Sequence, residues 1–144
     1  MASRLPLQPS SRKQIMRLHQ PDLRNRTKTA SMHALQVYRS LPDNEEARIL
    51  GKRMFRMVTR AGAFYRAAVR SRSLRSYLKR IDAALYDLDL GAYWLDLMIT
   101  ADDMGPRTNM KGLLSEIHEV MAILVSSKKA AKKMGNPETA MSSN

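Results

Sequence analysis

The chain lacks cysteine, and this absence narrows the chemistry open to it. None of its 144 residues is Cys, so disulfides, zinc–thiolate sites and thiol catalysis are excluded. No apolar run approaches the length of a membrane span, and the N-terminus lacks the apolar core of a secretory signal. We therefore expect a cytoplasmic protein with no membrane segment.

Acidic residues are also scarce. There are 13 Asp or Glu against 25 Lys or Arg, which gives a formal charge of +12 and a pI of about 10.5. Acid is absent from the whole stretch between Arg48 and Arg80. Such a field favours nucleic acid, an anionic membrane surface or an acidic protein as partner, and composition leaves all three open.

Signals for β-strands are missing as well. No segment alternates polar and apolar residues, and there are no Asn-Gly or Asp-Gly turns. Helical periodicity instead predicts helices at about 23–40, 45–70, 73–100 and 109–133. The predicted fold is all-α, an up-and-down four-helix bundle over residues 22–134.

The boundaries of these helices rest on specific residues. Pro42 stops the first helix and Asp43 is a plausible N-cap for the second. Between the second and third helices, "RSRS" offers Ser caps but no Gly or Pro, so one long helix is the alternative.

Both ends of the chain are expected to lie outside the bundle. Residues 1–21 are predicted to form a basic flexible arm, because Pro6 and Pro9 would break a helix there. An organellar transit peptide is the alternative, and the same prolines disfavour it. Residues 135–144 are predicted to form a flexible tail.

The second predicted helix separates its charges from its apolar residues. Plotted at about 100° per residue, its Lys and Arg fall within an arc of roughly 140°. Apolar residues fill the rest of the circle. Gly51 and Gly62 lie on the apolar side, where we expect neighbouring helices to approach closely.

The third predicted helix is apolar on two sides. One side is a core stripe that includes Ile81, Leu88 and Leu95. A second apolar group on the other side needs its own cover, which predicts a homo-oligomer; the alternative is a partner helix that wraps further round. The predicted oligomer interface consists of Tyr86, Leu90, Tyr93, Trp94 and Leu97.

The basic residues are expected to gather at one end of the bundle. If the helices run up and down, the junction of the second and third helices meets the "KKAAKK" segment, and acids gather at the opposite end. Phosphates relieve such crowding, and Arg, which dominates here, matches phosphate well. The predicted nucleic-acid-binding residues are Arg48, Lys52, Arg56, Arg60, Arg66, Arg70, Arg72, Arg75, Lys79, Arg80, Lys128 and Lys132.

Catalytic signals are absent from the sequence. His19, His33 and His118 show no metal-ligand spacing, and there is no Gly-rich phosphate loop. Asp87 and Asp89 lie two apart on a helix and point in different directions. We predict no catalytic residue, no metal and no cofactor, and a non-enzymatic protein. A protein-docking adaptor with an acidic partner is the rival function, and membrane-surface binding is disfavoured because the apolar face of the second helix is committed to the core.

Three segments resemble a known family: "LGKRMFRMVTRAGAFYRAA", "ALYDLDLGAYWLDLM" and "VSSKKAAKK". They are similar to the four-helix-bundle proteins encoded by intervening sequences of bacterial 23S rRNA genes. The accessory variability determinant of diversity-generating retroelements is similar in plan. The resemblance implies a pentameric ring, binding to RNA or RNA/DNA hybrid, and, for the retroelement type, a reverse transcriptase as partner. Met57, Phe64, Ala67 and Leu90 depart from the polar residues usual in the intervening-sequence proteins.

Overall fold

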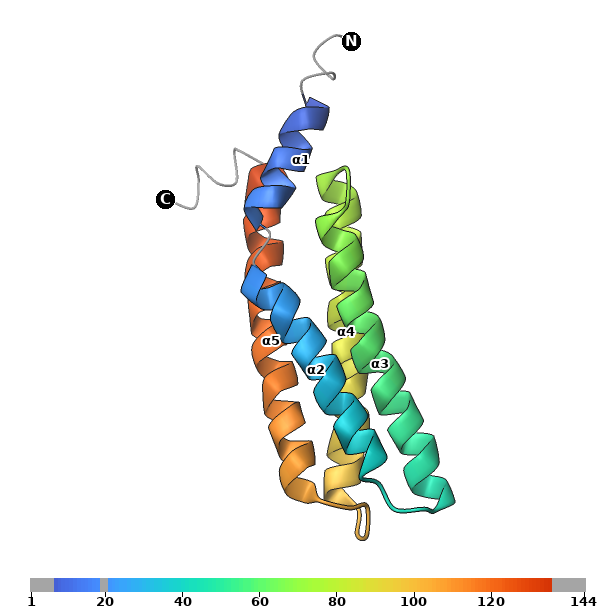
Figure 1. Cartoon of the computed structure of the whole chain (residues 1–144). Coiled ribbons are helices and arrows are strands. Elements are labelled where there is room, and N and C mark those ends of the chain that lie inside the picture. Colours follow the sequence, from blue (N-terminus) through green and yellow to red (C-terminus); the bar gives the residue numbers. More distant parts are fainter. Residues whose placement is uncertain (1–6, 19–20, 136–144) are drawn as a thin grey trace.

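The computed structural model describes residues 7–18 and 21–135, which form five helices. They are α1 (Leu7–Leu18), α2 (Pro21–Arg39), α3 (Glu45–Val69), α4 (Leu74–Thr100) and α5 (Arg107–Gly135). No strand occurs among these residues, so the predicted all-helical bundle is confirmed. Figure 1 shows an elongated molecule in which α2 to α5 run in alternating directions.

The N-terminal region differs from the prediction. Residues 7–18 of the expected flexible arm form helix α1, which contacts α4 and α5. Pro9 lies in the first turn, where a backbone N–H has no intrahelical acceptor and a proline costs little. Ile15 and Leu18 are buried against the bundle, at 1% and 6% exposure. The expected C-terminal tail lies outside the described residues except for Gly135, which ends α5.

Local capping sets the other helix boundaries. Asn44, and not the predicted Asp43, caps α3, because its side-chain oxygen accepts from the Ala47 N–H at 2.8 Å. Ser73 caps α4 by accepting from the Ser76 N–H at 3.1 Å. The alternative of one continuous helix is therefore wrong, and α3 and α4 form a hairpin.

The core lies between the four long helices. In α4 the buried line includes Tyr77, Ile81, Leu88, Leu95 and Met98, all at most 2% exposed. These spacings of three, four and seven keep one helix face inward. Each fully buried large side chain of this kind stabilises the fold by about 1.5–3 kcal/mol.

Glycines bring helices together as predicted. A Cβ at Gly62 of α3 would lie 3.3 Å from Ser31 Oγ of α2, and one at Gly51 would collide with the Leu41 side chain. None of the described helices combines the length and apolar character that crossing a lipid bilayer requires.

Candidate nucleic-acid interface

Helix α3 presents its basic residues to solvent. Because Met54, Val58 and Tyr65 face inward, the opposite side of the helix is free of packing. The predicted basic residues of this helix region are all exposed: Arg48, Lys52, Arg56, Arg60, Arg66 and Arg70. The predicted separation of a basic arc from an apolar arc is confirmed except at Ile49, which is 44% exposed beside Lys52 and Arg56.

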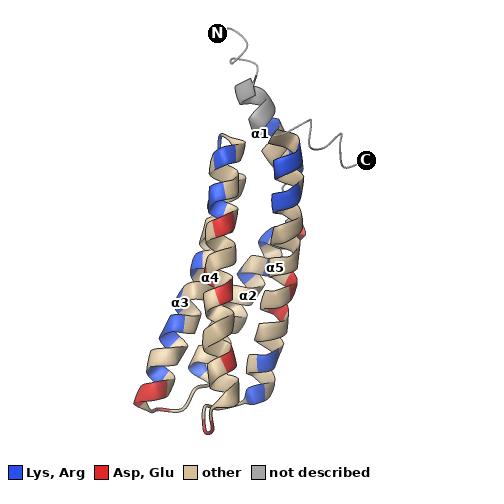
Figure 2. Cartoon of the chain, turned by 180° about the vertical axis from the view of Figure 1, so that it is seen from behind, with Lys and Arg blue, Asp and Glu red and all other residues tan. Residues whose placement is uncertain are grey.

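Basic residues also gather where α3 turns into α4 and where α5 ends. Figure 2 shows Lys and Arg at this end of the bundle and acidic residues in the loops at the opposite end. Arg72, Arg75 and Lys79 are exposed in the α3–α4 hairpin, and Lys132 is exposed near the end of α5. The loop acids therefore lie at the predicted end of the bundle, although Arg107 and Lys111 at the start of α5 place positive charge there too.

The start of α2 lies apart from the basic end of the bundle. Helix α1 lies alongside the upper part of α5, so α2 begins further down the bundle (Figure 1). Arg26 does not join the basic end and instead pairs with Glu119 of α5 at 3.1 Å. Arg24 and Lys28 face a groove on the flank of the molecule.

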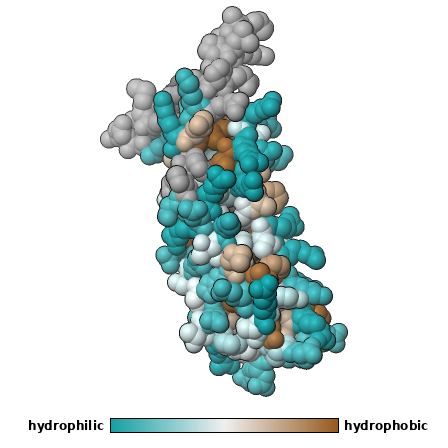
Figure 3. Space-filling view, in the orientation of Figure 1, coloured by the Kyte–Doolittle hydropathy of each residue, from teal (hydrophilic) through white to brown (hydrophobic). Residues whose placement is uncertain are grey.

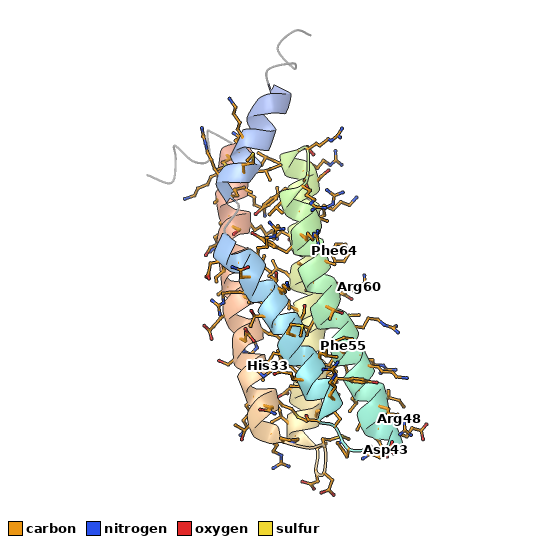
Figure 4. The ribbon with its side chains drawn as sticks, in the orientation of Figure 1. His33, Asp43, Arg48, Phe55, Arg60 and Phe64 are labelled. Carbon is orange, nitrogen blue, oxygen red and sulfur yellow. The ribbon has the colours of Figure 1, made fainter. Side chains whose placement is uncertain are left out.

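Some of the predicted binding residues are paired within the chain. Arg48 binds Asp43 at the lower end of α3, where Figure 4 labels both residues. Lys128 Nζ lies 2.6 Å from Asp82 Oδ1. A cation that already has a carboxylate partner gains less from a phosphate, so these two residues are weaker candidates.

Arg80 has a structural contact. Its Nη1 donates to Ser71 Oγ at 2.7 Å and lies 3.5 Å from the Ala67 carbonyl oxygen. Ser71 is buried, at 4% exposure. Arg80, in the second turn of α4, thus ties that helix to Ser71 and to the C-terminal end of α3, where carbonyl groups lack helical partners.

Arg60 faces a buried carboxylate. Its Nε lies 3.4 Å from Asp87 Oδ2 on α4, and its guanidinium lies 5.6 Å from the centre of the Phe64 ring. Figure 4 shows Arg60 and Phe64 on the outer part of α3. Burial raises the pKa of Asp87, and the neighbouring Arg60 opposes that rise. Asp89 is exposed, so the prediction that Asp87 and Asp89 do not form a pair is confirmed.

The other predicted binding residues make no ion pair with any residue in the described ranges. All of them are exposed, and they run from the first third of α3 through the hairpin to the end of α5: Lys52, Arg56, Arg66, Arg70, Arg72, Arg75, Lys79 and Lys132. This set, the free basic surface, holds positive charge that nothing in the described fold neutralises.

A buried polar cluster lies beneath the basic end. The hydroxyl of Tyr77 on α4 faces Ser127 on α5, inside the core. Burial, with a smaller contribution from Tyr65, raises the pKa of Tyr77 to about 12, and Ser127 acts in the opposite direction. The phenol therefore stays neutral and has a packing role at ordinary pH.

The predicted oligomer face is exposed in the single chain. Tyr86 is 66% exposed, Tyr93 55% and Leu97 36%, whereas Leu90 and Trp94 are half-buried. These exposures rule out the alternative in which a neighbouring helix of the same chain covers the whole face. Exposed large apolar side chains in one patch are typical of an interaction surface.

Basic residues border this apolar face more closely than the sequence indicated. The Arg53 guanidinium lies 5.0 Å from the centre of the Trp94 ring, and Tyr93 meets the same ring edge-on. A shallow groove of about 440 Å³ runs between α3 and α4 here. Apolar side chains of Ile49, Met57, Leu90 and Trp94 line it together with the cations Lys52, Arg53 and Arg56.

Metal-ligating side chains are not clustered in the part of the chain that the structure describes. Within residues 7–18 and 21–135, no group of three His, Asp or Glu side chains is placed to hold a metal ion. His33 Nδ1 lies 3.2 Å from Glu116 Oε1, and His118 is exposed. His19 lies outside the described residues. The absence of a catalytic site stays a prediction.

The sequence prediction did not include the flank groove among the binding sites. Arg24 and Lys28 of α2 and Arg66 of α3 line it. The spacing of four between Arg24 and Lys28 places them on one side of a helix. That spacing is visible in the sequence, but the neighbouring helix is not.

A solved structure has the same fold. The chain superposes on a protein of unknown function from the S23 ribosomal protein family of Bacteroides thetaiotaomicron VPI-5482 with a TM-score of 0.68. The match covers 74% of this chain and 98% of that one, at 20% sequence identity. The likeness is one of fold. No protein-family model matches this chain, and no curated protein sequence matches it. The relationship to intervening-sequence and retroelement proteins stays a prediction.

Proposed function

We propose that this protein is a non-enzymatic nucleic-acid-binding protein that takes RNA or an RNA/DNA hybrid. The observation that carries the proposal is the free basic surface, a set of exposed cations without acidic partners among the described residues on α3, the α3–α4 hairpin and the end of α5. Like charges so close together repel each other, and a polyanion relieves that repulsion while releasing its own counterions.

The composition of this surface also favours phosphate as its ligand. Arg66, Arg70, Arg72 and Arg75 are arginines where lysine would serve for solubility. The guanidinium group offers a planar fork that matches two phosphate oxygens at once. The single aromatic residue between Arg66 and Lys79 is the buried Tyr77, so we expect recognition of charge and shape with little reading of base sequence.

We further propose that the protein acts as a homo-oligomer, a pentameric ring in an up-and-down four-helix arrangement. Support comes from the exposed apolar face of α4 at Tyr86, Tyr93 and Leu97. A ring would repeat the free basic surface around an axis and raise affinity through multiple simultaneous contacts. A reverse transcriptase of a diversity-generating retroelement is the protein partner that the resemblance implies.

One observation favours a second function, that of a protein-docking adaptor. The groove beside Trp94 combines an apolar floor with Lys52, Arg53 and Arg56 at its edge, which suits an acidic amphipathic segment. Trp94 is the single tryptophan of the chain, so its fluorescence reports on this groove directly. An acidic polypeptide such as poly-glutamate that shifts this fluorescence and displaces RNA would favour the adaptor.

Charge reversal in the hairpin tests the main proposal. Arg70→Glu with Arg75→Glu should weaken binding of a fluorescein-labelled RNA, measured by anisotropy, by at least about tenfold. The matched control is Arg107→Glu with Lys111→Glu, which makes the same change in charge at the start of α5, at the other end of the bundle. Equal affinities of the two double variants, or no RNA binding by the wild type, would contradict the proposal.

A further inference from the structure

The groove on the flank of the molecule lies between the first half of α2 and the second half of α3. It is open to solvent and encloses about 780 Å³. In Figure 1, α2 starts against α5 and leans toward α3 as it descends, so the two helices diverge toward the start of α2. Figure 3 shows pale side chains of intermediate hydropathy between hydrophilic ones on this face.

Cations stand on both rims of the groove. Arg24 and Lys28 come from α2, and Arg66 comes from α3. All three are exposed, and none pairs with a carboxylate in the described parts of the chain. No Asp or Glu lines the groove. The rims therefore suit an anionic chain that lies along the groove and meets positive charge on each side.

The floor of the groove includes small hydroxyl-bearing residues beside the buried Tyr65. The hydroxyls of Thr27, Ser31 and Thr59 each donate to a carbonyl of their own helix, at 3.0, 3.1 and 2.8 Å. Because their protons are used in this way, their oxygens remain available only as acceptors. Gly62 and Ala63 add no bulk to the floor, so a ligand can approach it closely.

The two features together fit one kind of ligand. A ribose carries a 2′-hydroxyl that can donate a hydrogen bond, and its flanking phosphates are anionic, whereas deoxyribose lacks that donor. Adjacent packed helices have axes only about 8–10 Å apart, and the contact between Gly62 and Ser31 holds α2 and α3 close here. A single strand can enter such a groove, but the rigid rod of a duplex cannot.

We propose that this groove binds the backbone of a single-stranded RNA segment. Phosphates contact Arg24, Lys28 and Arg66, and ribose 2′-hydroxyls donate to the floor oxygens of residues such as Thr59. Arg66 belongs both to the groove and to the free basic surface, so the strand continues from the groove to the hairpin. The inference rests on the proposed function and adds to it a strand type and a sugar preference.

Filling the groove with negative charge gives the first test. Ala63 is exposed and lines the groove, so Ala63→Glu places a carboxylate between the rims. Its matched control is Ala122→Glu, at another exposed helical alanine, on α5. The probe is labelled oligouridine of about 12 nucleotides, within the usual range of single-strand sites. We expect Ala63→Glu to weaken binding by at least about tenfold and Ala122→Glu to change it little.

Removing a floor oxygen gives a second test that a structural role would not mimic. Thr59→Val keeps the shape of the side chain and deletes the hydroxyl. Wild-type protein should bind oligouridine more tightly than the oligodeoxyuridine of equal length. The variant should lose roughly threefold to tenfold of that preference by weakening on RNA alone. Lys28→Gln, which leaves the floor intact, should weaken both probes equally.

The outcomes separate this inference from the proposed function. If the hairpin reversals weaken oligouridine binding but Ala63→Glu behaves like Ala122→Glu, the groove proposal is overturned and the proposed function stands. Equal wild-type affinity for the ribose and deoxyribose probes overturns the role of the floor. If an RNA duplex binds as tightly as the single strand and Ala63→Glu weakens its binding as much, the proposal that the groove selects a single strand is overturned. If no RNA binds, both proposals fail.

Discussion

The number of phosphate contacts made by the free basic surface can be counted from the salt dependence of binding. We consider replacing Arg66, Arg70 and Arg75 with Gln, which removes charge and introduces no repulsion. All three are exposed, and none has an ion-pair partner among residues 7–18 and 21–135. The change should therefore leave folding intact and remove contacts to the ligand alone.

The size of the effect follows from counterion release. Each contact between a cation and a single-stranded phosphate changes the slope of log K against log salt by about 0.7. Losing three contacts should reduce the slope by about 2. At about 0.1 M salt, the same term lowers the association constant by about 100-fold, or roughly 2.7 kcal/mol.

The assay is anisotropy of a labelled RNA at several salt concentrations, with circular dichroism to confirm folding. The control replaces Arg48, Arg107 and Lys111 with Gln, an equal change in charge at the acidic end of the bundle. Arg48 and Arg107 already have carboxylate partners, so the slope should be unchanged. If the control reduces the slope as much as the test variant does, net charge and not the hairpin explains binding. An affinity loss with no change in slope would show that these arginines do not contact phosphate.

The remaining predictions concern the fold and the assembly. Burial raises the pKa of Asp87 in the folded protein above its ordinary 3.8, so the stability that this residue contributes is fully present below that value and is lost as pH rises. Asp87→Asn should therefore gain stability relative to the wild type in urea unfolding as pH increases from about 4 to 7. A difference in stability between variant and wild type that stays constant with pH would contradict this. Ile15→Ala should lower the free energy of unfolding by about 2–4 kcal/mol in the same assay, because Ile15 is 1% exposed. Met16→Ala, at a residue that is 72% exposed, should lower it hardly at all. Equal losses from the two variants would mean that α1 does not pack against the bundle. Ser73→Ala removes the cap of α4 and should cost about 1 kcal/mol by chemical denaturation, and no loss would refute the capping role. If α4 joins subunits, Tyr93→Lys should lower the mass measured by light scattering, and a wild-type monomer would end the oligomer proposal.

The boundaries of the four long helices were largely predictable because they depend on local signals. Pro42, the Ser residues near position 73 and the apolar periodicity act within a few residues of each boundary. The error at Asp43 is of the same local kind, since two capping residues stand side by side and geometry selects Asn44. Helix α1 was missed because its stability comes from Ile15 and Leu18 packing on distant helices.

The candidate site was predictable in part. The exposed cations of α3 followed from helical spacing alone, and the structure places them as expected. The sequence could not show that Arg60 faces the buried Asp87, that Arg80 binds Ser71, or that Arg53 covers Trp94. Each of these contacts joins residues on different elements, so it depends on the rotation and offset of one helix against another.

The sequence by itself determined the helical fold, the excess of positive charge and its separation from the apolar residues, because these properties follow from composition and a period of 3.6. Only the tertiary structure decided which cations remain free, since a carboxylate partner is a matter of distance across helices. It also created the flank groove, where Arg24 and Lys28 of α2 lie across from Arg66 of the next helix, α3. The sequence predicted close packing at Gly62, but only the structure shows that the helix packed there is α2, at Ser31.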